Sequence, residues 1–198
     1  RSPPRVLVQA SAVGYYGDRG DEILTEASPP GRGFLPDTCV AWEAATAPAV
    51  ERGIRVVALR FGVILSARGG ALAKMLPPFR LGLGGVVGSG RQWWPWLSID
   101  DAVGLIRHAI ATDAVLGAVN AVAPEPATNR TFTAALGRAV RRPAFLPLPA
   151  FAARVVLGEM ADALLLSSAR VVAGRALEIG FRHRHPTLES ALGAALAI

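Results

Sequence analysis

Residues 54–65, with the sequence IRVVALRFGVIL, decide the fold. They form the clearest strand pattern in the chain, because apolar and β-branched residues follow one another almost without interruption. A shorter run of the same kind covers residues 5–10. A helical pattern from about Pro36 to Gly53 joins the two runs, with a break or restart at Pro48. Strand, helix and strand at this spacing predict a right-handed crossover unit of a parallel sheet.

After residue 65 the pattern changes, and glycine and aromatic residues become frequent. The predicted helices lie near 70–80, from Ala102 to about Thr112 with Asp100 or Asp101 as N-cap, from Thr128 or Asn129 to Val140, and over 149–157, 159–165 and 188–196. Short strands are predicted near 84–87, 93–99 and 117–123. We therefore predict an α/β fold, with a first part in residues 1–65 and a second region in residues 66–198 that packs on it.

Composition and charge limit the classes of partner. The chain has 198 residues, of which 52% are hydrophobic and 18% charged, so it can bury a substantial core. We find no uncharged apolar stretch long enough to span a membrane. The net charge is +6, yet the basic residues are scattered, and their densest cluster, at 138–142, is short; we therefore expect no nucleic-acid partner. The single cysteine, Cys39, rules out an internal disulfide and fits a reducing, cytoplasmic setting.

Several long motifs, in order along nearly the whole chain, carry a resemblance to a known family. They are SAVGYYG (11–17), AWEAA (41–45), LRFGVIL (59–65), GGALAKMLPPFRLGLGG (69–85), GSGRQWWPWLSIDDAVGLI (88–106), NAVAPEPATNRTFTAALGRAVRRPAFLPLPAF (120–151) and LGEMADALLLSSARV (157–171). The chain resembles the epimerase-family proteins of the atypical, extended short-chain dehydrogenase/reductase superfamily, some of which are labelled cell-division inhibitors. The resemblance implies NADP as cofactor, with NAD as the alternative, a small-molecule substrate, and allows a homodimer.

The resemblance also implies which part of the family fold this sequence represents. Members begin with a Rossmann half in which a glycine-rich turn receives the cofactor pyrophosphate at a helix N-terminus. No such turn opens a helix after a strand here, and GLGGVVGSG (82–90) is interpreted as a loop. We expect the C-terminal two-thirds of the family fold: the end of a Rossmann-type NAD(P)-binding sheet in residues 1–65, and a substrate-binding region in 66–198 with some segments returning to the sheet.

The usual catalytic motif of the superfamily, Tyr-x-x-x-Lys, is absent. In that motif the lysine ammonium lowers the pKa of the tyrosine hydroxyl, so that the phenol can exchange a proton with substrate. Arg19 follows Tyr15 at this spacing, and Gly20 follows Tyr16. The tyrosine and lysine positions of the family fall near Leu35 and Cys39.

Ser11, Tyr15 and Tyr16 are the candidate catalytic residues. Ser11 lies, within one residue, where the superfamily has the hydroxyl that polarises the substrate, and we also predict that it contacts the cofactor. The alternative is a hydroxyl at a strand end that only forms a hydrogen bond with the backbone. The two tyrosines supply either an acid or a ring against nicotinamide, and the alternative is core packing with the hydroxyl at the surface. We interpret Cys39 as a small buried hydrophobe, and Glu43 as a helix-capping or intrahelical partner that is not a base.

Cofactor and substrate contacts are predicted in two further motifs. The resemblance implies that backbone groups of Gly62, Val63 and Ile64 meet the nicotinamide carboxamide, and ordinary sheet core is the alternative. In GSGRQWWPWLSIDD (88–101) the family uses an arginine on a nucleotide-sugar diphosphate. Trp94 occupies that position here, and Arg91 is close but out of register. This difference argues against a nucleotide sugar as the substrate. The predicted substrate-lining residues are Arg91, Trp93, Trp94 and Trp96, and a packed interdomain wall is the alternative.

No metal site is predicted. His183 and His185 are two residues apart in FRHRHP (181–186), which in a strand would place them on one solvent-facing side. A structural or catalytic metal would need further ligands nearby, and Cys39 is far away in sequence.

Two functions of different class remain. The first is an atypical NADP-dependent oxidoreductase or epimerase-like enzyme acting on a small molecule, in which Ser11 and one of the tyrosines handle the substrate oxygen. The second is a non-catalytic NADP-binding sensor or interaction protein that kept the fold and lost the chemistry. Nucleic-acid binding is a weaker third option, which steep salt dependence would reveal.

The absent pyrophosphate turn gives a first testable prediction. We expect the 198-residue chain by itself to bind NADPH more weakly than micromolar, because no glycine-rich helix N-terminus in it can hold the pyrophosphate. Titration followed by nicotinamide fluorescence measures this directly. A dissociation constant at or below about 1 μM would contradict the prediction.

Overall fold

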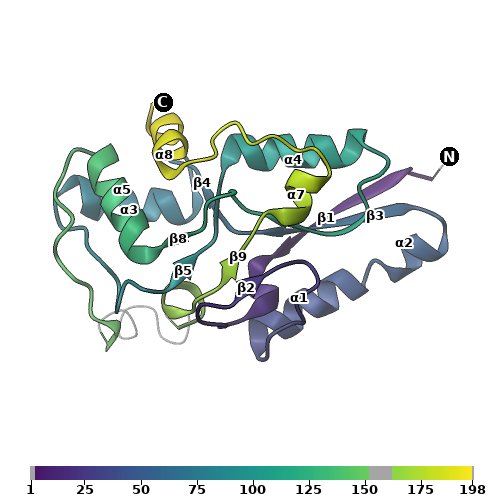
Figure 1. The fold of residues 1–198 in the computed structure, drawn as a ribbon, viewed down its shortest axis with the longest axis horizontal. Coiled ribbons are helices and arrows are strands. Elements are labelled where there is room, and N and C mark those ends of the chain that lie inside the picture. Colours follow the sequence, from purple (N-terminus) through teal and green to yellow (C-terminus); the bar gives the residue numbers. More distant parts are fainter. Residues whose placement is uncertain (1–2, 152–161, 198) are drawn as a thin grey trace.

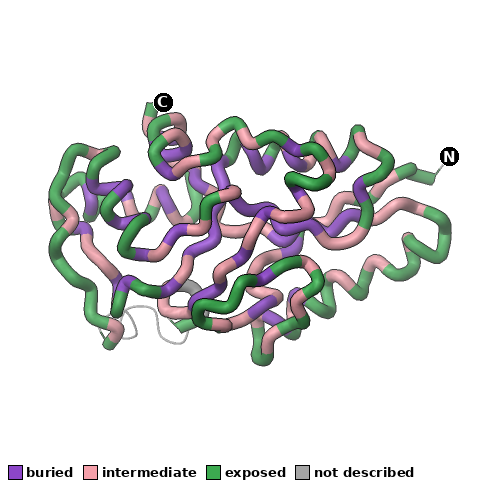
Figure 2. The backbone as a smooth tube through the Cα atoms, in the orientation of Figure 1, coloured by how far each residue is buried: buried purple, intermediate pink, exposed green. Residues whose placement is uncertain are grey.

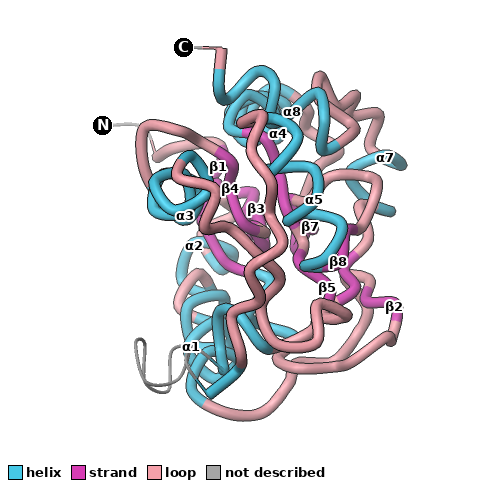
Figure 3. Tube along the Cα trace, turned by 90° about the vertical axis from the view of Figure 1, so that its left-hand side faces the viewer, coloured by secondary structure: helices cyan, strands magenta, loops and turns pink. Residues whose placement is uncertain are grey.

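The computed structural model describes residues 3–151 and 162–197. Its centre is a parallel sheet of three strands in the order β1-β3-β7 (Figure 1). The strands are β1 (Val6–Ala12), β3 (Arg55–Phe61) and β7 (Gly117–Ala121). Helices α1 (Phe34–Ala44) and α2 (Ala47–Glu51) lie on one face of the sheet, and α4 (Ile99–Ala111) lies on the other, as the turned view also shows (Figure 3). The predicted α/β class and the strand–helix–strand unit are thus confirmed.

The run 54–65 is two strands, whereas the sequence predicts one. β3 ends at Phe61, and β4 (Val63–Leu65) leaves the central sheet to pair in parallel with β6 (Trp96–Ser98). Gly62 is the point of divergence: its N–H donates to the carbonyl of Ala121 at 3.1 Å, and the N–H of Val63 donates to the carbonyl of Pro95 at 2.8 Å. A Cβ at Gly62 would lie 2.6 Å from the carbonyl oxygen of Pro95, so only glycine allows this approach.

The remaining elements form small sheets and a second group of helices. β2 (Ile23–Leu24) pairs in parallel with β9 (Arg170–Val171), and β5 (Trp93–Trp94) pairs antiparallel with β8 (Ala127–Thr128). The helices are α3 (Gly70–Arg80), α5 (Asn129–Ala139), α7 (Gly174–Glu178) and α8 (Leu188–Leu196). A 3₁₀ turn, η1 (Val13–Tyr16), follows β1, and a π-helical turn, η2 (Asp162–Leu166), precedes β9.

Some boundaries differ from the prediction for local reasons. Ser98, and neither aspartate, caps α4: its hydroxyl accepts from the N–H of Asp101 at 3.0 Å and donates to the Asp101 carboxylate at 2.6 Å. Residues 84–87 form only an isolated bridge between Val87 and Leu148, and Pro95 divides the strand expected over 93–99. The helices expected over 149–157 and 159–165 lie largely outside the described residues. The Thr128 cap of α5 and the helix over 188–196 are confirmed.

The described residues form two hydrophobic cores. Figure 2 shows buried residues on the central strands and on the helices that pack around them. One core lies around the central sheet, with Val57, Leu59 and Val119 from its strands and Leu105 from α4. The other lies between α3, α5 and α8, and includes Trp94 and Trp96. β7 and α4 both follow residue 65, and β7 pairs with β3 while α4 packs on β1 and β3. The division of the chain at residue 65 stays a prediction.

No helix in the described parts of the chain is long and apolar enough to cross a membrane. The cytoplasmic location stays a prediction.

Gly62→Ala tests the divergence of β3 and β4. We expect a loss of about 1 to 3 kcal/mol in the free energy of unfolding, because the new methyl group would meet the Pro95 carbonyl and the backbone must shift. Urea unfolding measures the loss.

Gly193→Ala in α8 is the matched control. A Cβ at Gly193 meets nothing within 4 Å, so alanine there should be neutral or stabilise by about 0.5 to 1 kcal/mol. Equal effects of the two substitutions would contradict the close approach at Gly62.

Candidate functional site

Three polar residues lie side by side across the carboxyl end of the central sheet. Ser11 of β1 is in register with Arg60 of β3, and Arg60 is in register with Asn120 of β7. All three are buried, with at most 5% of their surface exposed. Residues directly across parallel strands point to the same face, so the register alone brings a hydroxyl, a guanidinium and an amide together. In α/β sheets this end of the strands is where ligands bind.

Arg60 is the centre of this cluster. Its Nε and one terminal nitrogen donate to the two carboxylate oxygens of Glu43 in α1, at 2.9 and 2.8 Å. Its other terminal nitrogen donates to the Tyr16 hydroxyl at 3.0 Å. The ring of Tyr15 packs face-on, with its centre 3.4 Å from the guanidinium carbon. A bidentate ion pair, a hydrogen bond and a cation–π contact therefore satisfy this buried cation.

The cluster extends from Tyr16 to the outer edge of β7. The Tyr16 hydroxyl donates to the side-chain oxygen of Asn120 at 2.7 Å, and the Asn120 amide nitrogen donates to the carbonyl of Val172 at 3.2 Å. Glu26 accepts from the backbone N–H of Asn120 at 2.8 Å. A continuous chain of hydrogen bonds thus joins α1, β3, η1 and β7.

The pKa values in the cluster follow from these contacts. Burial acts to raise the pKa of the Glu43 carboxyl, but hydrogen bonds from Arg60 and Ser11 and the Arg60 charge outweigh burial, so the pKa lies below its usual value. Burial acts to lower the pKa of Arg60, and its bonds to Glu43 and Tyr16 outweigh that effect and raise it. Burial raises the pKa of the Tyr16 hydroxyl. The carboxylate and the guanidinium therefore stay charged, and the phenol stays protonated.

Ser11 donates its hydroxyl hydrogen to Glu43 at 2.7 Å, which leaves its oxygen lone pairs as acceptors. Cys39 is 3% exposed, and burial is the main reason that the pKa of its thiol is raised. The interpretation of Cys39 as a small buried hydrophobe is confirmed. The interpretation of Glu43 is wrong: its partners, Arg60 and Ser11, lie on strands outside its own helix, because a half-buried carboxylate needs a cation more than it needs a helical neighbour.

The two tyrosines have different environments. Tyr16 is fully buried, hydroxyl included, so the alternative that placed its hydroxyl at the surface is wrong; Arg60 and Asn120 supply the polar partners that allow this burial. Tyr15 is partly exposed, and its hydroxyl has no hydrogen-bond partner among the described residues. Of the two, Tyr15 has the free hydroxyl.

The backbone groups predicted to meet a cofactor lie beside this cluster. The N–H groups of Gly62 and Val63 are bonded to Ala121 and Pro95, and Ile64 is paired with Leu97 in the small sheet. The N–H groups of Gly62 and Val63 are therefore already engaged within the fold.

The predicted substrate-lining residues divide into two groups. Trp94 and Trp96 expose only 7% and 1% of their surface and fill the second core, where Trp94 packs on Phe132. Trp93 is half-buried and Arg91 is exposed. A lining role is therefore open only to Arg91 and Trp93, since alternate residues of a strand face opposite sides.

Ser168 joins Trp93 to the loop that follows η1. Its hydroxyl accepts from the Trp93 N–H at 3.1 Å and donates to the Gly20 carbonyl at 2.7 Å, and its own N–H donates to Asp18 at 3.2 Å. The Trp93 indole nitrogen donates to Asp21 at 2.5 Å. The two halves of the predicted site are thus connected through residues 18–21.

The two histidines are not on a solvent-facing strand, contrary to the prediction. His183 contacts the carbonyl of Val122 at 3.0 Å, and His185 lies 3.2 Å from Asp100 at the start of α4. Both positions lie in a loop whose backbone N–H groups bind Asp101. In the described parts of the chain, no group of three or more His, Cys, Asp or Glu residues is arranged to hold a metal ion.

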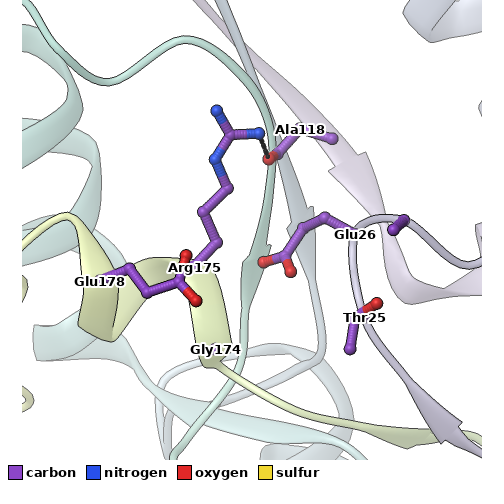
Figure 4. Close-up of a pocket in the computed structure, with 7 residues that line it drawn as sticks. Thr25, Glu26, Ala118, Gly174, Arg175 and Glu178 are labelled. Carbon is purple, nitrogen blue, oxygen red and sulfur yellow. Dashed lines mark hydrogen bonds between the residues drawn. The ribbon is translucent and has the colours of Figure 1, made fainter.

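An open depression of about 610 Å³ lies elsewhere, at the outer edge of β7 (Figure 4). Glu26 and Glu178 extend into it, and Arg175 spans it to donate to the carbonyls of Ala118 and Leu116, at 3.0 and 2.6 Å. Arg175 and Glu26 satisfy backbone groups at the edge of β7, which would otherwise be unpaired. None of the predicted site residues lines this depression.

Sequence reasoning missed Arg60, Asn120 and Ser168. A signal existed for Arg60, because a charged residue inside the apolar strand RVVALRF must find a partner when it is buried. A buried arginine in this strand indicates a nearby carboxylate, although not which one. No comparable signal marks Asn120 or Ser168, since small polar residues are common at strand ends and in loops.

Known proteins resemble this chain over nearly its whole length. An epimerase family protein of Mycobacterium bovis is 47% identical over 189 residues, which cover 96% of this chain and 63% of the relative. The mouse epimerase family protein SDR39U1 is 41% identical over 197 residues, covering 98% of this chain and 67% of that protein. The chain belongs to the epimerase family. The crystal structure of human epimerase family protein SDR39U1 (isoform 2) with NADPH matches at a TM-score of 0.91 and 38% identity, covering 99% of this chain and 67% of the human one.

This epimerase-family chain thus spans about two-thirds of the length of the relatives it matches. Its residues 148–195 also match a family described as a domain of unknown function (DUF1731). The Rossmann-like epimerase fold and the membership predicted from the motifs are both confirmed.

Glu43→Gln tests the central ion pair of this epimerase-family chain. We expect a loss of about 2 to 3 kcal/mol in the free energy of unfolding at pH 7, because the substitution leaves the Arg60 charge buried without a counter-ion. The exposed Glu51, mutated to Gln, should change stability by less than about 0.5 kcal/mol and serves as the control.

The stability difference between wild type and Glu43→Gln should depend on pH in one direction only. The folded-state pKa of Glu43 is lowered, so its contribution is fully present above the unfolded pKa of about 4.3 and is lost as pH falls through the folded pKa. The stability difference between wild type and Glu43→Gln should therefore stay constant from pH 6 to 8 and shrink only below about pH 4. A difference that shrinks near neutral pH would contradict the assignment.

Proposed function

We propose that this member of the epimerase family is an atypical NADP-dependent oxidoreductase or epimerase-like enzyme that acts on a small molecule. The human relative solved with NADPH supports the cofactor. The observation that carries the proposal is the polar cluster at the carboxyl end of the sheet, where Ser11 and Tyr15 border a buried ion pair. NADP, when bound, supplies or accepts the hydride.

The residues of this chain fit one end of such a cofactor. Ser11, at the end of β1, and the carbonyl side of Gly62 lie where nicotinamide meets the sheet in Rossmann-type folds. The sequence has no glycine-rich turn for the pyrophosphate, so these residues can orient the nicotinamide end only.

Proton handling falls to Ser11 and Tyr15. The usual tyrosine and lysine positions are expected near Leu35 and Cys39. Leucine carries no ionisable group, and burial raises the thiol pKa of Cys39. Ser11 presents its oxygen as an acceptor, because Glu43 takes its hydrogen. The Tyr15 hydroxyl, free within the described residues and held beside Arg60, is the proton donor of this proposal.

One observation favours the second candidate, a non-catalytic NADP-binding sensor or interaction protein. Ser11 is only 5% exposed, and Tyr16 has its hydroxyl fully engaged inside the fold. A cluster with these properties can also serve as a scaffold that responds to cofactor binding.

Tyr15→Phe in the full-length protein separates the two candidates. We expect turnover of at least one member of a panel of carbonyls and alcohols, followed by nicotinamide absorbance, and a fall in kcat of about 100-fold in the variant. The unfolding free energy should change by less than about 0.5 kcal/mol, because the ring remains against Arg60. Clear NADPH binding without turnover of any panel member would overturn the proposed enzymatic function and favour the non-catalytic NADP-binding protein.

A further inference from the structure

Arg170 is a partly buried cation for which the described residues supply no hydrogen-bond acceptor. It opens β9, which pairs with β2 beside the loop of residues 18–21. Its guanidinium carbon lies 4.6 Å from the centre of the Trp93 ring. Its Nε is shielded from solvent, and among the described residues no hydrogen-bond acceptor meets it. A shielded N–H without an acceptor is costly, and native structures rarely leave one so.

Arg170 is exceptional within this molecule. Five described arginines are not exposed, and four of them donate to carboxylates or backbone carbonyls of the protein: Arg19, Arg55, Arg60 and Arg175. In the same set of residues Arg170 has no such bond, and no carboxylate lies within 4.0 Å of it. Among the described, non-exposed arginines, Arg170 is therefore the one whose guanidinium donates to no protein acceptor.

The platform beneath this guanidinium is held firmly. The Trp93 indole nitrogen donates to Asp21, and the Trp93 backbone N–H donates to the hydroxyl of Ser168, which itself bonds Gly20. Asp21 is thus engaged by the indole and forms no ion pair with Arg170. A fixed aromatic face keeps the guanidinium plane in one orientation, which lowers the entropy lost when a ligand binds.

We propose that Arg170 and Trp93 form an oxyanion-binding site, and that its ligand is a phosphate or carboxylate group of the substrate. A guanidinium is a planar fork of N–H donors that matches two oxygens of either group, and stacking on an aromatic ring leaves that fork available. Trp93 was predicted to line the substrate site, and Arg170 adds the charge that selects an acidic small molecule. The anion site itself does not depend on the proposed function. Only the statement that the bound anion belongs to the substrate rests on it.

Anion titration tests the site without requiring turnover. The full-length protein, saturated with NADP⁺ so that cofactor phosphate sites are filled, is titrated at low salt with inorganic phosphate and, separately, with succinate, by calorimetry. We expect saturable binding of at least one probe, and the stronger probe identifies the oxyanion. Arg170→Met should weaken it about tenfold or more, and Arg170→Lys less, because lysine keeps the charge without the fork.

Arg107→Met is the matched control, since it removes an exposed arginine on α4 and should change the affinity by less than about twofold. Thermal unfolding of each variant separates loss of the site from loss of the fold. Equal affinities of wild type and Arg170→Met, or no binding of either probe, would overturn the site. A protein that binds the anion through Arg170 but shows no turnover would refute the proposed enzymatic function and leave the anion site intact.

Discussion

Arg60 is a cation inside a strand that is otherwise apolar, and its guanidinium must find acceptors within the fold. Glu43 reaches it from α1, Tyr16 from η1, and the Tyr15 ring packs on its face. Because removing Glu43 or Tyr16 would leave buried donors of Arg60 unsatisfied, these contacts fix where the helix and the turn sit on the sheet. The positions of Ser11 and Tyr15 depend on this arrangement.

The same charge pair explains how the site differs from the usual dehydrogenase pattern. In that pattern a lysine on the helix tunes a tyrosine one turn earlier. The sequence predicts that this lysine position falls near Cys39, and the buried cation that contacts both tyrosines is Arg60 of β3. An arginine in a bidentate pair stays charged and immobile, so it orders its neighbours without exchanging protons. In the proposed enzyme, proton exchange is therefore assigned to the hydroxyls of Ser11 and Tyr15.

The sequence predicted the parallel sheet because its strand patterns are long and apolar, and it predicted the buried Cys39 from residue type. It could not predict the break at Gly62, which depends on a carbonyl of Pro95 more than 30 positions away in the chain. The partner of Glu43 was missed for the same reason, since strand register decides which side chains meet. Tyr16 was misjudged because a buried phenol depends on partners from β3 and β7 that local pattern does not reveal.

Arg60 and Arg170 show how one residue type serves two purposes in this molecule. Both contact an aromatic ring, but Arg60 has a carboxylate and a hydroxyl within the fold, whereas the structure gives Arg170 neither among the described residues. A guanidinium whose donors are satisfied internally holds elements together, and its removal affects stability. A guanidinium that is oriented but unsatisfied contributes little to the fold and keeps its donors for a ligand. Stability therefore depends on Arg60, whereas the proposed recognition of an anion depends on Arg170.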